Sequence, residues 1–562
     1  MLDDLRVQLD AWLADDPDER DRAELEALAA DDDGAAADEL ADRFSGRLEF
    51  GTAGLRGTVG AGPNRMNRAV VRGTTAALAR WLLGRGRGIA GTGAAEAGVV
   101  IGCDARHRSD EFADEAARVL AGAGIKVHLL PRRQPTPLLA FAVRHLHAAA
   151  GIMITASHNP PAYNGYKLYL RDGAQIIPPA DAEIEAEIRS LGPLSAVRLA
   201  PPDSPLVVQH GDEVAQAYLD LICAASPAPP DAAWLRFVYT PLHGVAGTLA
   251  MRAFEQAGFT PPDLVAAQAE PDPDFPSVTF PNPEEPGALD LALAQARRSG
   301  ADLVLANDPD GDRLAVAVTD ADGAWRTLTG DQVGALLGAY LLDVTATESP
   351  GDRLVVTTIV SSTLLARVAA AAGAQYAETL TGFKWIVRAE RPGGRFVFGY
   401  EEALGYAVGE IVRDKDGIGA ALALLGLAAR ARSRGGSLLD AYDALETAHG
   451  VHLTGQVSVA VAAPGGIMAQ LRAVPPRDFG GARVIDTSDL TGGTPDLPSA
   501  DVLSYQLLGA RVVIRPSGTE PKIKAYLEIV EPVIGGRLDQ ARQSAAGRLG
   551  ALREAVAALL AS

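Results

Sequence analysis

Three cycles of strand-like and helix-like segments follow one another along this chain, and they restrict its fold more than any other feature. The first cycle runs from the apolar segment 99–103 through a helix-like segment at 109–124 to the apolar run 151–154. Similar cycles begin near residues 235 and 353. Because strands that alternate with helices form sheets covered by helices, the pattern predicts an α/β protein with three similar domains.

The two ends of the chain follow other patterns. Residues 1 to about 45 place apolar residues at helical spacing among acidic ones, which predicts a helical preface. The last part has several strand-like runs followed by a helix-like segment, which predicts a smaller α+β domain. Turn-rich joints near residues 203, 325 and 452 complete the division. We therefore expect four domains, and their predicted ranges are 1–204 with the preface, 205–326, 327–451 and 452–562.

Composition restricts the partners. The formal charge of −20 argues against nucleic acid or an anionic membrane, so an anionic substrate would need a locally cationic cleft. The charged N-terminal segment lacks the apolar centre of a signal peptide, and no segment approaches ~20 uninterrupted apolar residues. These features predict a cytoplasmic protein that binds no membrane. Cys103 and Cys223 are the only cysteines, too few for a disulfide framework, and are expected to fill the core.

Three alternating aspartates, Asp308, Asp310 and Asp312, follow a strand-like run and suit a divalent cation. A calcium loop would need Gly and Glu at its sixth and twelfth positions, where this chain has Arg313 and Thr319. Carboxylates with open coordination favour Mg²⁺, whose other ligands would come from a phosphate. A solvated acidic turn is the alternative interpretation.

Ser157 follows the apolar run 151–154, and its hydroxyl is expected at the carboxyl end of a buried strand, where open α/β sheets bind ligands. His158 and Lys167 give this possible nucleophile two basic neighbours, although Ser and Asn also commonly cap turns. The chain contains neither a GxSxG elbow nor a GxxxxGK[ST] loop. Acyl hydrolysis and ATP-loop chemistry are therefore not favoured.

Three further segments suit a sugar phosphate. The turn RPSGTEPKIK, residues 515–524, offers a bidentate guanidinium, hydroxyls and backbone N–H groups to phosphate oxygens. The alternative interpretation of this segment is an exposed turn that binds no ligand. TGFKW at 381–385 holds a lysine, and GYEEALGY at 399–406 holds adjacent carboxylates that can accept hydrogen bonds from sugar hydroxyls. Only six of the 51 basic residues are lysines, and five of the six lie in or near these motifs, which suggests sites that need a compact ammonium group.

Taken together, the motifs closely resemble those of the α-D-phosphohexomutase superfamily, the phosphoglucomutases and phosphomannomutases. GTAGLRG at 51–57, TASHNP, DPDGDR, TGFKW, EEALGY and RPSGTEP occur in this order and cover nearly all of the chain after the preface. The resemblance implies three similar α/β domains and a smaller fourth domain around a central cleft. It also implies Mg²⁺ as cofactor and a sugar 1,6-bisphosphate as intermediate and activator.

The same resemblance assigns roles to individual residues. Ser157 would be the phosphoserine, and it would bind Mg²⁺ together with Asp308, Asp310 and Asp312. His158 and Lys167 would be acid and base candidates, with Arg56 in the catalytic cleft. The residues expected to contact the sugar are Arg313, Thr381, Gly382, Lys384, Glu401 and Ala403. The residues expected to hold the non-reacting phosphate are Arg515, Ser517, Gly518, Thr519 and Lys524.

One departure bears on the substrate. Many hexose mutases have serine two residues after the first glutamate of the sugar loop, where this chain has Ala403. The departure resembles the subgroup of glucose-type and pentose-type mutases. We expect a monomer or homodimer that interconverts glucose 1-phosphate and glucose 6-phosphate, with mannose and pentose phosphates as alternative substrates. A phosphatase and a regulator that binds sugar phosphates without turnover are alternatives of other classes.

Overall fold

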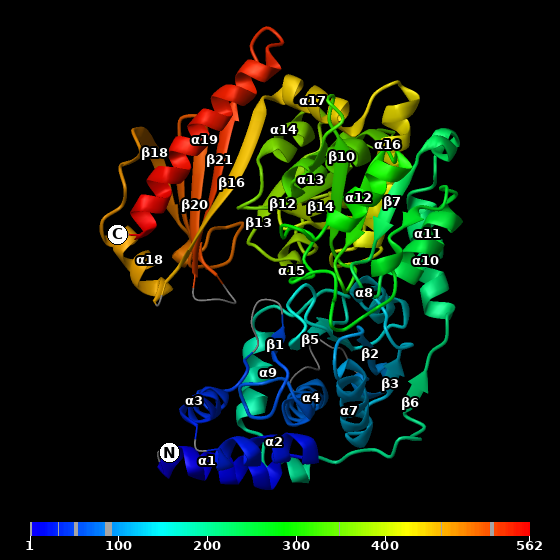
Figure 1. The fold of residues 1–562 in the computed structure, drawn as a ribbon, viewed down its shortest axis with the longest axis vertical. Helices are drawn as coiled ribbons and strands as arrows, with labels where there is room; N and C mark the ends of the chain where they lie inside the picture. Colours follow the sequence, from blue (N-terminus) through cyan, green and yellow to red (C-terminus); the bar gives the residue numbers. More distant parts are fainter. Residues whose placement is uncertain are drawn as a thin grey trace. The chain divides into compact units, whose positions relative to one another are not determined.

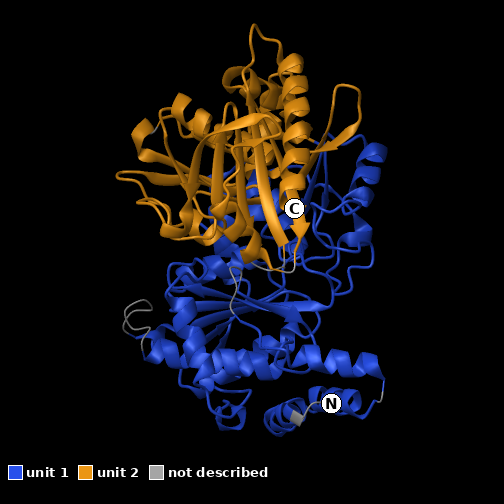
Figure 2. Ribbon diagram, turned by 90° about the vertical axis from the view of Figure 1, so that its left-hand side faces the viewer, with its two compact units in different colours: residues 1–227, 236–315, 411–422 blue, residues 228–235, 316–410, 423–562 orange. Residues whose placement is uncertain are grey.

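The structure, a computed structural model, describes residues 3–31, 33–49, 54–84, 93–347, 349–461, 463–517 and 522–561. It divides into two compact units (Figure 2). Unit 1 comprises residues 1–227, 236–315 and 411–422, and unit 2 comprises residues 228–235, 316–410 and 423–562. Figure 1 shows the helices and strands of the chain in their sequence order.

The preface is helical, as the sequence predicted, and its helices are α1 (Asp3–Asp15), α2 (Glu19–Ala30) and α3 (Gly34–Arg43). Aspartates cap two of them, because the side chains of Asp18 and Asp33 accept hydrogen bonds from backbone N–H groups in the first turn of α2 and of α3. The apolar faces of the three helices bury a small core around Leu9, Leu25 and Leu40. The preface is therefore a packed element of unit 1.

A six-stranded sheet carries the serine motif, with strand order β1-β5-β4-β2-β3-β6. The strands are β1 (Leu55–Thr58), β2 (Val99–Cys103), β3 (Val127–Leu129), β4 (Ala150–Ile154), β5 (Tyr163–Leu170) and β6 (Val207–Gln209). The helices of this part are α4 (Arg68–Leu83), α6 (Ala94–Ala97), α7 (Ser109–Gly122), α8 (Thr136–His145) and α9 (Ala180–Arg189). β2 pairs in parallel with β3 and β4, whereas β5 runs antiparallel to β4 and β1. The carboxyl end of β4 therefore leads directly into the loop that carries Ser157.

The aspartate motif follows a second set of parallel strands in unit 1. β7 (Phe237–Thr240) pairs in parallel with β8 (Asp263–Leu264) and β9 (Leu303–Asn307). The helices here are α10 (Glu213–Ala225), α11 (Gly247–Ala257) and α12 (Asp290–Ser299). The chain passes into unit 2 within the next strand, β10 (Leu314–Thr319). The three aspartates thus lie at the carboxyl end of β9, the edge where parallel sheets place their ligands.

Unit 2 begins with a sheet of order β13-β12-β14-β15, in which β12 pairs in parallel with β13 and β14. Its strands are β12 (Arg353–Thr358), β13 (Gln375–Thr379), β14 (Arg395–Glu401) and β15 (Gly405–Val408), preceded by β11 (Trp325–Thr327), which pairs with β10. The helices are α13 (Gly330–Val344), α14 (Leu364–Ala371), α15 (Phe383–Ile386) and α17 (Leu438–His449), and α16 (Gly417–Ser433) continues into unit 2 from unit 1.

The last part of unit 2 is an antiparallel sheet of order β16-β21-β20-β19-β18-β17. Its strands are β16 (Val451–Ala460), β17 (Asp478–Phe479), β18 (Ala482–Asp489), β19 (Leu503–Leu507), β20 (Ala510–Pro516) and β21 (Lys522–Glu531), and its helices are α18 (Pro464–Ala473) and α19 (Leu538–Ala561). Apolar residues of α19, among them Leu552 and Val556, pack on this sheet. The predicted fold class, three α/β domains followed by a smaller α+β domain, is confirmed.

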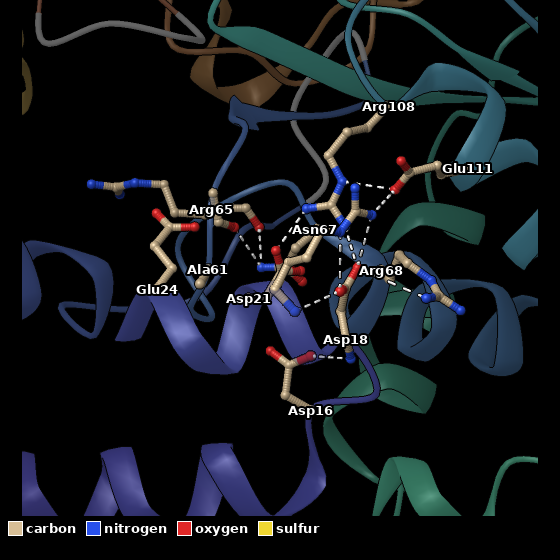
Figure 3. Close-up of polar contacts among 12 residues, drawn as sticks. Asp16, Asp18, Asp21, Glu24, Ala61, Arg65, Asn67, Arg68, Arg108 and Glu111 are labelled. Carbon is tan, nitrogen blue, oxygen red and sulfur yellow. Dashed lines mark hydrogen bonds and ion pairs between the residues drawn. The ribbon is translucent and has the colours of Figure 1, made fainter. Parts of the chain in front are cut away.

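A buried ion-pair cluster ties the preface to the first sheet (Figure 3). Arg108 precedes α7 in a left-handed conformation, with a φ of 64°. Its guanidinium donates to Asp18 Oδ2 at 2.5 Å, Asp21 Oδ1 at 2.7 Å and Glu111 Oε2 at 3.1 Å. Asp18 and Asp21 are both buried. Arg108 therefore pairs with both buried carboxylates of the preface, and Arg20 and Arg68 also pair with Asp18.

We expect Arg108→Met to lower the free energy of unfolding by about 3–5 kcal/mol, because it leaves the buried Asp21 without its cation, whereas Asp18 keeps Arg20 at 3.4 Å and Arg68 at 3.8 Å. Arg6→Met is the control, since Arg6 pairs with Asp10 at an exposed position and should change stability by less than about 1 kcal/mol. Urea unfolding of both variants measures the difference, and equal losses would contradict the role of Arg108.

Candidate active site

Ser157 lies in a strained turn directly after β4. Its φ of 56° is in the left-handed region, which residues with a side chain seldom adopt outside functional turns. Its backbone N–H donates to Thr155 Oγ1 at 2.9 Å. Ser157 Oγ donates to Asp308 Oδ2 at 3.1 Å and lies 3.1 Å from Nδ1 of His158. The structure thus brings the predicted nucleophile into contact with one predicted metal ligand and one predicted base.

The three aspartates converge because the turn that carries them is tight. Gly311 has a φ of 73°, and its N–H donates to the carbonyl of Asp308 at 2.9 Å. A Cβ atom at Gly311 would lie 2.8 Å from Cβ of Ala246, so a side chain would collide there. One carboxylate oxygen from each of Asp308, Asp310 and Asp312 lies within 4.8 Å of the other two. All three residues are fully buried.

Lysines compensate part of this buried negative charge. Lys167 Nζ on β5 lies 2.7 Å from Asp310 Oδ2 and 3.0 Å from Asp312 Oδ2. Burial opposes ionisation, but Lys167 and Lys415 hold the pKa of Asp312 well below its usual range. Burial and the neighbouring carboxylates raise the pKa of Asp308 well above its usual range. The cluster is therefore unevenly compensated, with Asp308 the least stabilised anion.

The cluster also keeps oxygen atoms that suit a cation. Asp310 Oδ1 and Asp312 Oδ1 are buried and have no hydrogen-bond partner among the described residues. Unpaired buried carboxylate oxygens cost free energy unless they bind a cation. The three carboxylates offer only oxygen atoms as ligands. Such a set fits Mg²⁺, which prefers hard oxygen ligands.

Further cationic and basic side chains border the serine turn. Arg56 Nη1 on β1 donates to Asn159 Oδ1 at 3.1 Å. The backbone N–H of Arg313 donates to Asp308 Oδ1 at 2.9 Å, and its guanidinium pairs with Glu284 at 3.1 Å. Burial, together with Arg313 and Arg56, lowers the pKa of His158 well below its usual range. A neutral imidazole beside Ser157 Oγ can accept a proton.

Arg313 lies in unit 1, and the other predicted sugar-binding residues lie in unit 2. Thr381 and Gly382 precede α15, and Gly382 has a φ of 117°. Lys384 is buried within α15, and its Nζ lies 5.9 Å from the centroid of the Trp385 ring. Glu401 ends β14, and Ala403 lies in the turn before β15.

Glu402, beside Glu401, accepts from Ser361 Oγ at 3.2 Å and Thr358 Oγ1 at 3.4 Å. Burial and Glu401 raise the pKa of Glu402 to about 7. The sequence indicated this adjacent pair of carboxylates, and the resemblance assigned Glu401 to the sugar but gave no role to Glu402.

The predicted phosphate-binding residues also lie in unit 2. Arg515 on β20 is opposite Lys524 on β21, and its guanidinium lies 5.8 Å from the centroid of the Tyr526 ring. Ser517 follows β20, and its N–H donates to the carbonyl of Lys522 at 2.8 Å. Gly518 and Thr519 lie outside the described residues. An apolar cluster that includes Leu380, Val513 and Tyr526 joins the base of this hairpin to the segment before Thr381.

The comparisons with known proteins match this architecture domain by domain. The phosphoglucomutase/phosphomannomutase family matches at residues 47–193 with its alpha/beta/alpha domain I, at 216–323 with domain II, at 329–447 with domain III and at 468–542 with its C-terminal domain. The chain belongs to this family. Its members interconvert sugar phosphates, so the chain is a phosphosugar mutase, an isomerase. The predicted resemblance is confirmed.

Relatives within the family carry different substrate names. The chain is 42% identical to a protein of Haemophilus influenzae named "Probable phosphomannomutase", over 82% of this chain and 93% of that protein. It is 35% identical to a phosphopentomutase of Mus musculus, over 89% and 86% of the two chains. It is 36% identical to a phosphoglucomutase of Staphylococcus epidermidis, over 88% and 92%.

A crystal structure of a phosphoglucomutase/phosphomannomutase family protein from Burkholderia thailandensis shares the fold. Its TM-score is 0.66 at 23% identity, and the match covers 90% of this chain and 97% of that one.

Among the described residues, no helix is both long and apolar enough to cross a membrane.

Three residues of this mutase site, Lys415, Asp414 and Arg106, were not assigned a role from the sequence. Lys415 Nζ lies 3.3 Å from Asp312 Oδ2, on a segment that returns to unit 1 about 100 residues after the aspartates. Asp414 beside it accepts from Tyr169 on β5 at 2.7 Å. The scarcity of lysine was the only signal for Lys415. The sequence gave no signal for Arg106, whose guanidinium donates to backbone carbonyls of the serine turn.

Asp416 in the same segment makes the stability of the mutase depend on pH. Its Oδ1 accepts from Tyr218 and from the N–H groups of Ile418 and Gly419, and burial raises its pKa to about 6. Because the folded pKa lies above the ordinary value of 3.8, folding favours the protonated form. This contribution to stability is complete below about pH 4 and is lost as the pH rises through about 6.

We expect Asp416→Asn, which keeps the accepting oxygen, to remove this loss. Between about pH 5 and about pH 7.5 the wild type should lose about 1–2 kcal/mol more unfolding free energy than the variant. Urea unfolding at the two pH values measures the difference, and parallel pH profiles would rule the assignment out.

Proposed function

We propose that this mutase interconverts a sugar 1-phosphate and a sugar 6-phosphate, most readily those of glucose, through a phosphoserine at Ser157. The contact of Ser157 Oγ with Asp308, at the edge of the buried carboxylate cluster, carries this proposal. It places the oxygen that would bear the phosphoryl group beside the residues suited to a metal. A protein that only bound sugar phosphates would need neither this oxygen nor this cluster.

The proposed reaction uses two phosphoryl transfers. In the first, the bond from phosphorus to Ser157 Oγ breaks as a bond to the free sugar hydroxyl forms, which gives a sugar 1,6-bisphosphate. The proton of that sugar hydroxyl passes to Ser157 Oγ. In the second, the bond from the other phosphorus to its sugar oxygen breaks as a bond to Ser157 Oγ forms, and the serine proton, which His158 Nδ1 is within reach of, goes to the freed sugar oxygen. The atoms balance without any further reactant.

Asp308, Asp310 and Asp312 would hold Mg²⁺ together with the phosphoserine. The bound cation would neutralise charge on the phosphoryl group during transfer. Lys167 keeps two of these carboxylates in place by contacts of 2.7 and 3.0 Å. Arg56, Arg313 and Lys415 add positive charge at the same site, in a chain whose overall charge is −20. These residues would supply the locally cationic region that an anionic substrate requires.

Other residues predicted from the resemblance would bind the rest of the substrate. Arg515, Ser517 and Lys524, with Gly518 and Thr519, would hold the phosphate that does not react. Thr381, Gly382, Lys384 and Glu401 would contact the sugar. Because the bisphosphate must bind in two orientations, much of the affinity should come from the phosphate contacts, and the sugar contacts should tolerate either orientation.

The choice of sugar rests on the loop between β14 and β15. Ala403 removes one hydroxyl that many hexose mutases place at this position, a departure that we associate with glucose-type and pentose-type mutases. Mannose phosphate and pentose phosphates remain the alternative substrates, because the relative named phosphomannomutase is 42% identical to the chain and the phosphopentomutase 35%, against 36% for the phosphoglucomutase. We also propose the four domain ranges given above.

Turnover tests the function directly. With Mg²⁺ and a trace of glucose 1,6-bisphosphate, kcat/KM should be highest for glucose 1-phosphate when it is compared with mannose and ribose 1-phosphates. Ser157→Ala should abolish turnover on every sugar, because the oxygen that carries the phosphoryl group is gone. Full turnover by Ser157→Ala would exclude the phosphoserine. Phosphate release without isomer formation would indicate a phosphatase, and sugar-phosphate binding without turnover would indicate a regulator.

Metal binding can be measured separately from activity. Calorimetric titration with Mg²⁺ alone should show that Asp308→Asn weakens binding by at least about 10-fold, by analogy with the usual effect of altering the residues around a metal. Asp212→Asn is the matched control, because it removes one exposed carboxylate of unit 1. Removal of the metal with EDTA should abolish turnover, and added Mg²⁺ should restore it. Equal affinities of the two variants would remove the aspartate cluster from the metal site.

A further inference from the structure

Several backbone carbonyls in the loop that carries Ser157 point toward one buried side chain, Arg106. Arg106 Nη1 donates to the carbonyls of Pro160 at 2.8 Å and Tyr163 at 3.0 Å. Its Nη2 donates to the carbonyls of Ser157 at 2.6 Å and Asn159 at 2.5 Å. The two terminal nitrogens carry four N–H groups in all, so each N–H has one carbonyl to which it can donate.

Arg106 is itself fixed from several sides. Its backbone N–H donates to Asp104 Oδ1 at 3.0 Å, and its Nε lies 3.4 Å from Asp104 Oδ2. Asp104 follows β2 directly and also accepts from Ser109 Oγ at 2.7 Å. The guanidinium lies 5.0 Å from the centroid of the Phe275 ring. Arg106 is only 4% exposed and Asp104 only 1%, so the pair forms a rigid support behind the turn.

Arg106 supplies hydrogen-bond donors that the segment around Ser157 lacks. Ser157 needs a left-handed backbone, and the two prolines at 160 and 161 supply no N–H groups, so the turn has more carbonyls than local donors. Buried carbonyls without donors cost free energy. A guanidinium can meet four of them in one plane, whereas a lysine has three donors on a single atom.

We propose that Arg106 is a positioning residue for phosphoryl transfer, which holds the Ser157 turn so that Oγ stays at Asp308. The inference rests on the proposed function, and it adds a residue to which no role was assigned from the sequence. Arg106 acts through the backbone, because its contacts are with the carbonyls of residues 157–163 and not with Ser157 Oγ. Its loss should therefore slow the chemical step more than it weakens substrate binding.

Arg106→Lys and Arg106→Gln test the proposal. A displacement of about 1 Å at a reacting atom can cost about 100-fold in rate, so we expect kcat to fall about 100-fold in both variants. KM should stay within about threefold of the wild type, because the predicted substrate-binding residues are unchanged. Arg353→Lys is the matched control, since Arg353 is also buried and donates to the carbonyls of Leu342 and Ala372. It should lose stability as the Arg106 variants do but keep its kcat.

Two more measurements keep the test decisive. Asp104→Asn leaves Arg106 in place but removes its counter-charge, and it should lower kcat about 10-fold, between the wild type and the Arg106 variants. Amide hydrogen exchange over residues 156–165 should be faster in Arg106→Lys than in Arg353→Lys, whether or not the protein turns over. If the Arg106 variants keep kcat within threefold of the wild type, or raise KM alone, the proposal is wrong.

The failure of the proposed function has a different signature. In that case the wild type itself lacks mutase turnover, or Ser157→Ala retains it, and a role of Arg106 in phosphoryl transfer falls with it. An active wild type, an inactive Ser157→Ala and normal Arg106 variants would overturn the role of Arg106 alone.

Discussion

The burial of three carboxylates on one short turn is the constraint on which the rest of unit 1 depends. Like charges this close cannot be buried unless cations approach them, since desolvation removes the water that would otherwise stabilise each anion. The cations come from distant parts of the chain: Lys167 from β5 and Lys415 from the segment after β15. The strand pairing of β5 with β4 and the return of residues 411–422 to unit 1 therefore serve the electrostatics of the site as well as the fold.

The same constraint gives a physical reason for the uneven use of lysine. Arginine supplies most of the basic residues, but the two positions that touch Asp312 are lysines. A compact ammonium can lie between Asp310 and Asp312 and contact both, whereas a planar guanidinium prefers one carboxylate in a bidentate pair. Where the chain must instead meet a row of backbone carbonyls, as at Arg106, it uses arginine, whose planar fork carries more donors than an ammonium.

The sequence predicted the elements of the site better than their assembly. Ser157 and the aspartates each follow an apolar strand directly, so local pattern and turn chemistry were enough to place them at strand ends. The antiparallel β5 was not predicted, because its polar and glycine-containing segment, NGYKLYL, carries no clear alternation and is set by its neighbours β1 and β4. Lys415 and Arg106 could not be assigned for the same reason: their partners lie about 50 to 100 residues away in the sequence, and one chain gives no measure of such pairs.

If Ser157 carries a phosphoryl group, the charge balance of the site changes in a definite direction. The hydroxyl proton that now goes to Asp308 disappears, and about 1.5 to 2 negative charges are added beside a carboxylate whose ionised form is already the least stabilised of the three. Lys167 cannot neutralise this added negative charge, because its ammonium already contacts Asp310 and Asp312. The phosphorylated state therefore requires additional positive charge at Asp308, and a divalent cation bound there would supply it. In this view the metal, the aspartates and the phosphoserine stabilise one another, and the backbone support behind the turn keeps Oγ in place while its charge alternates.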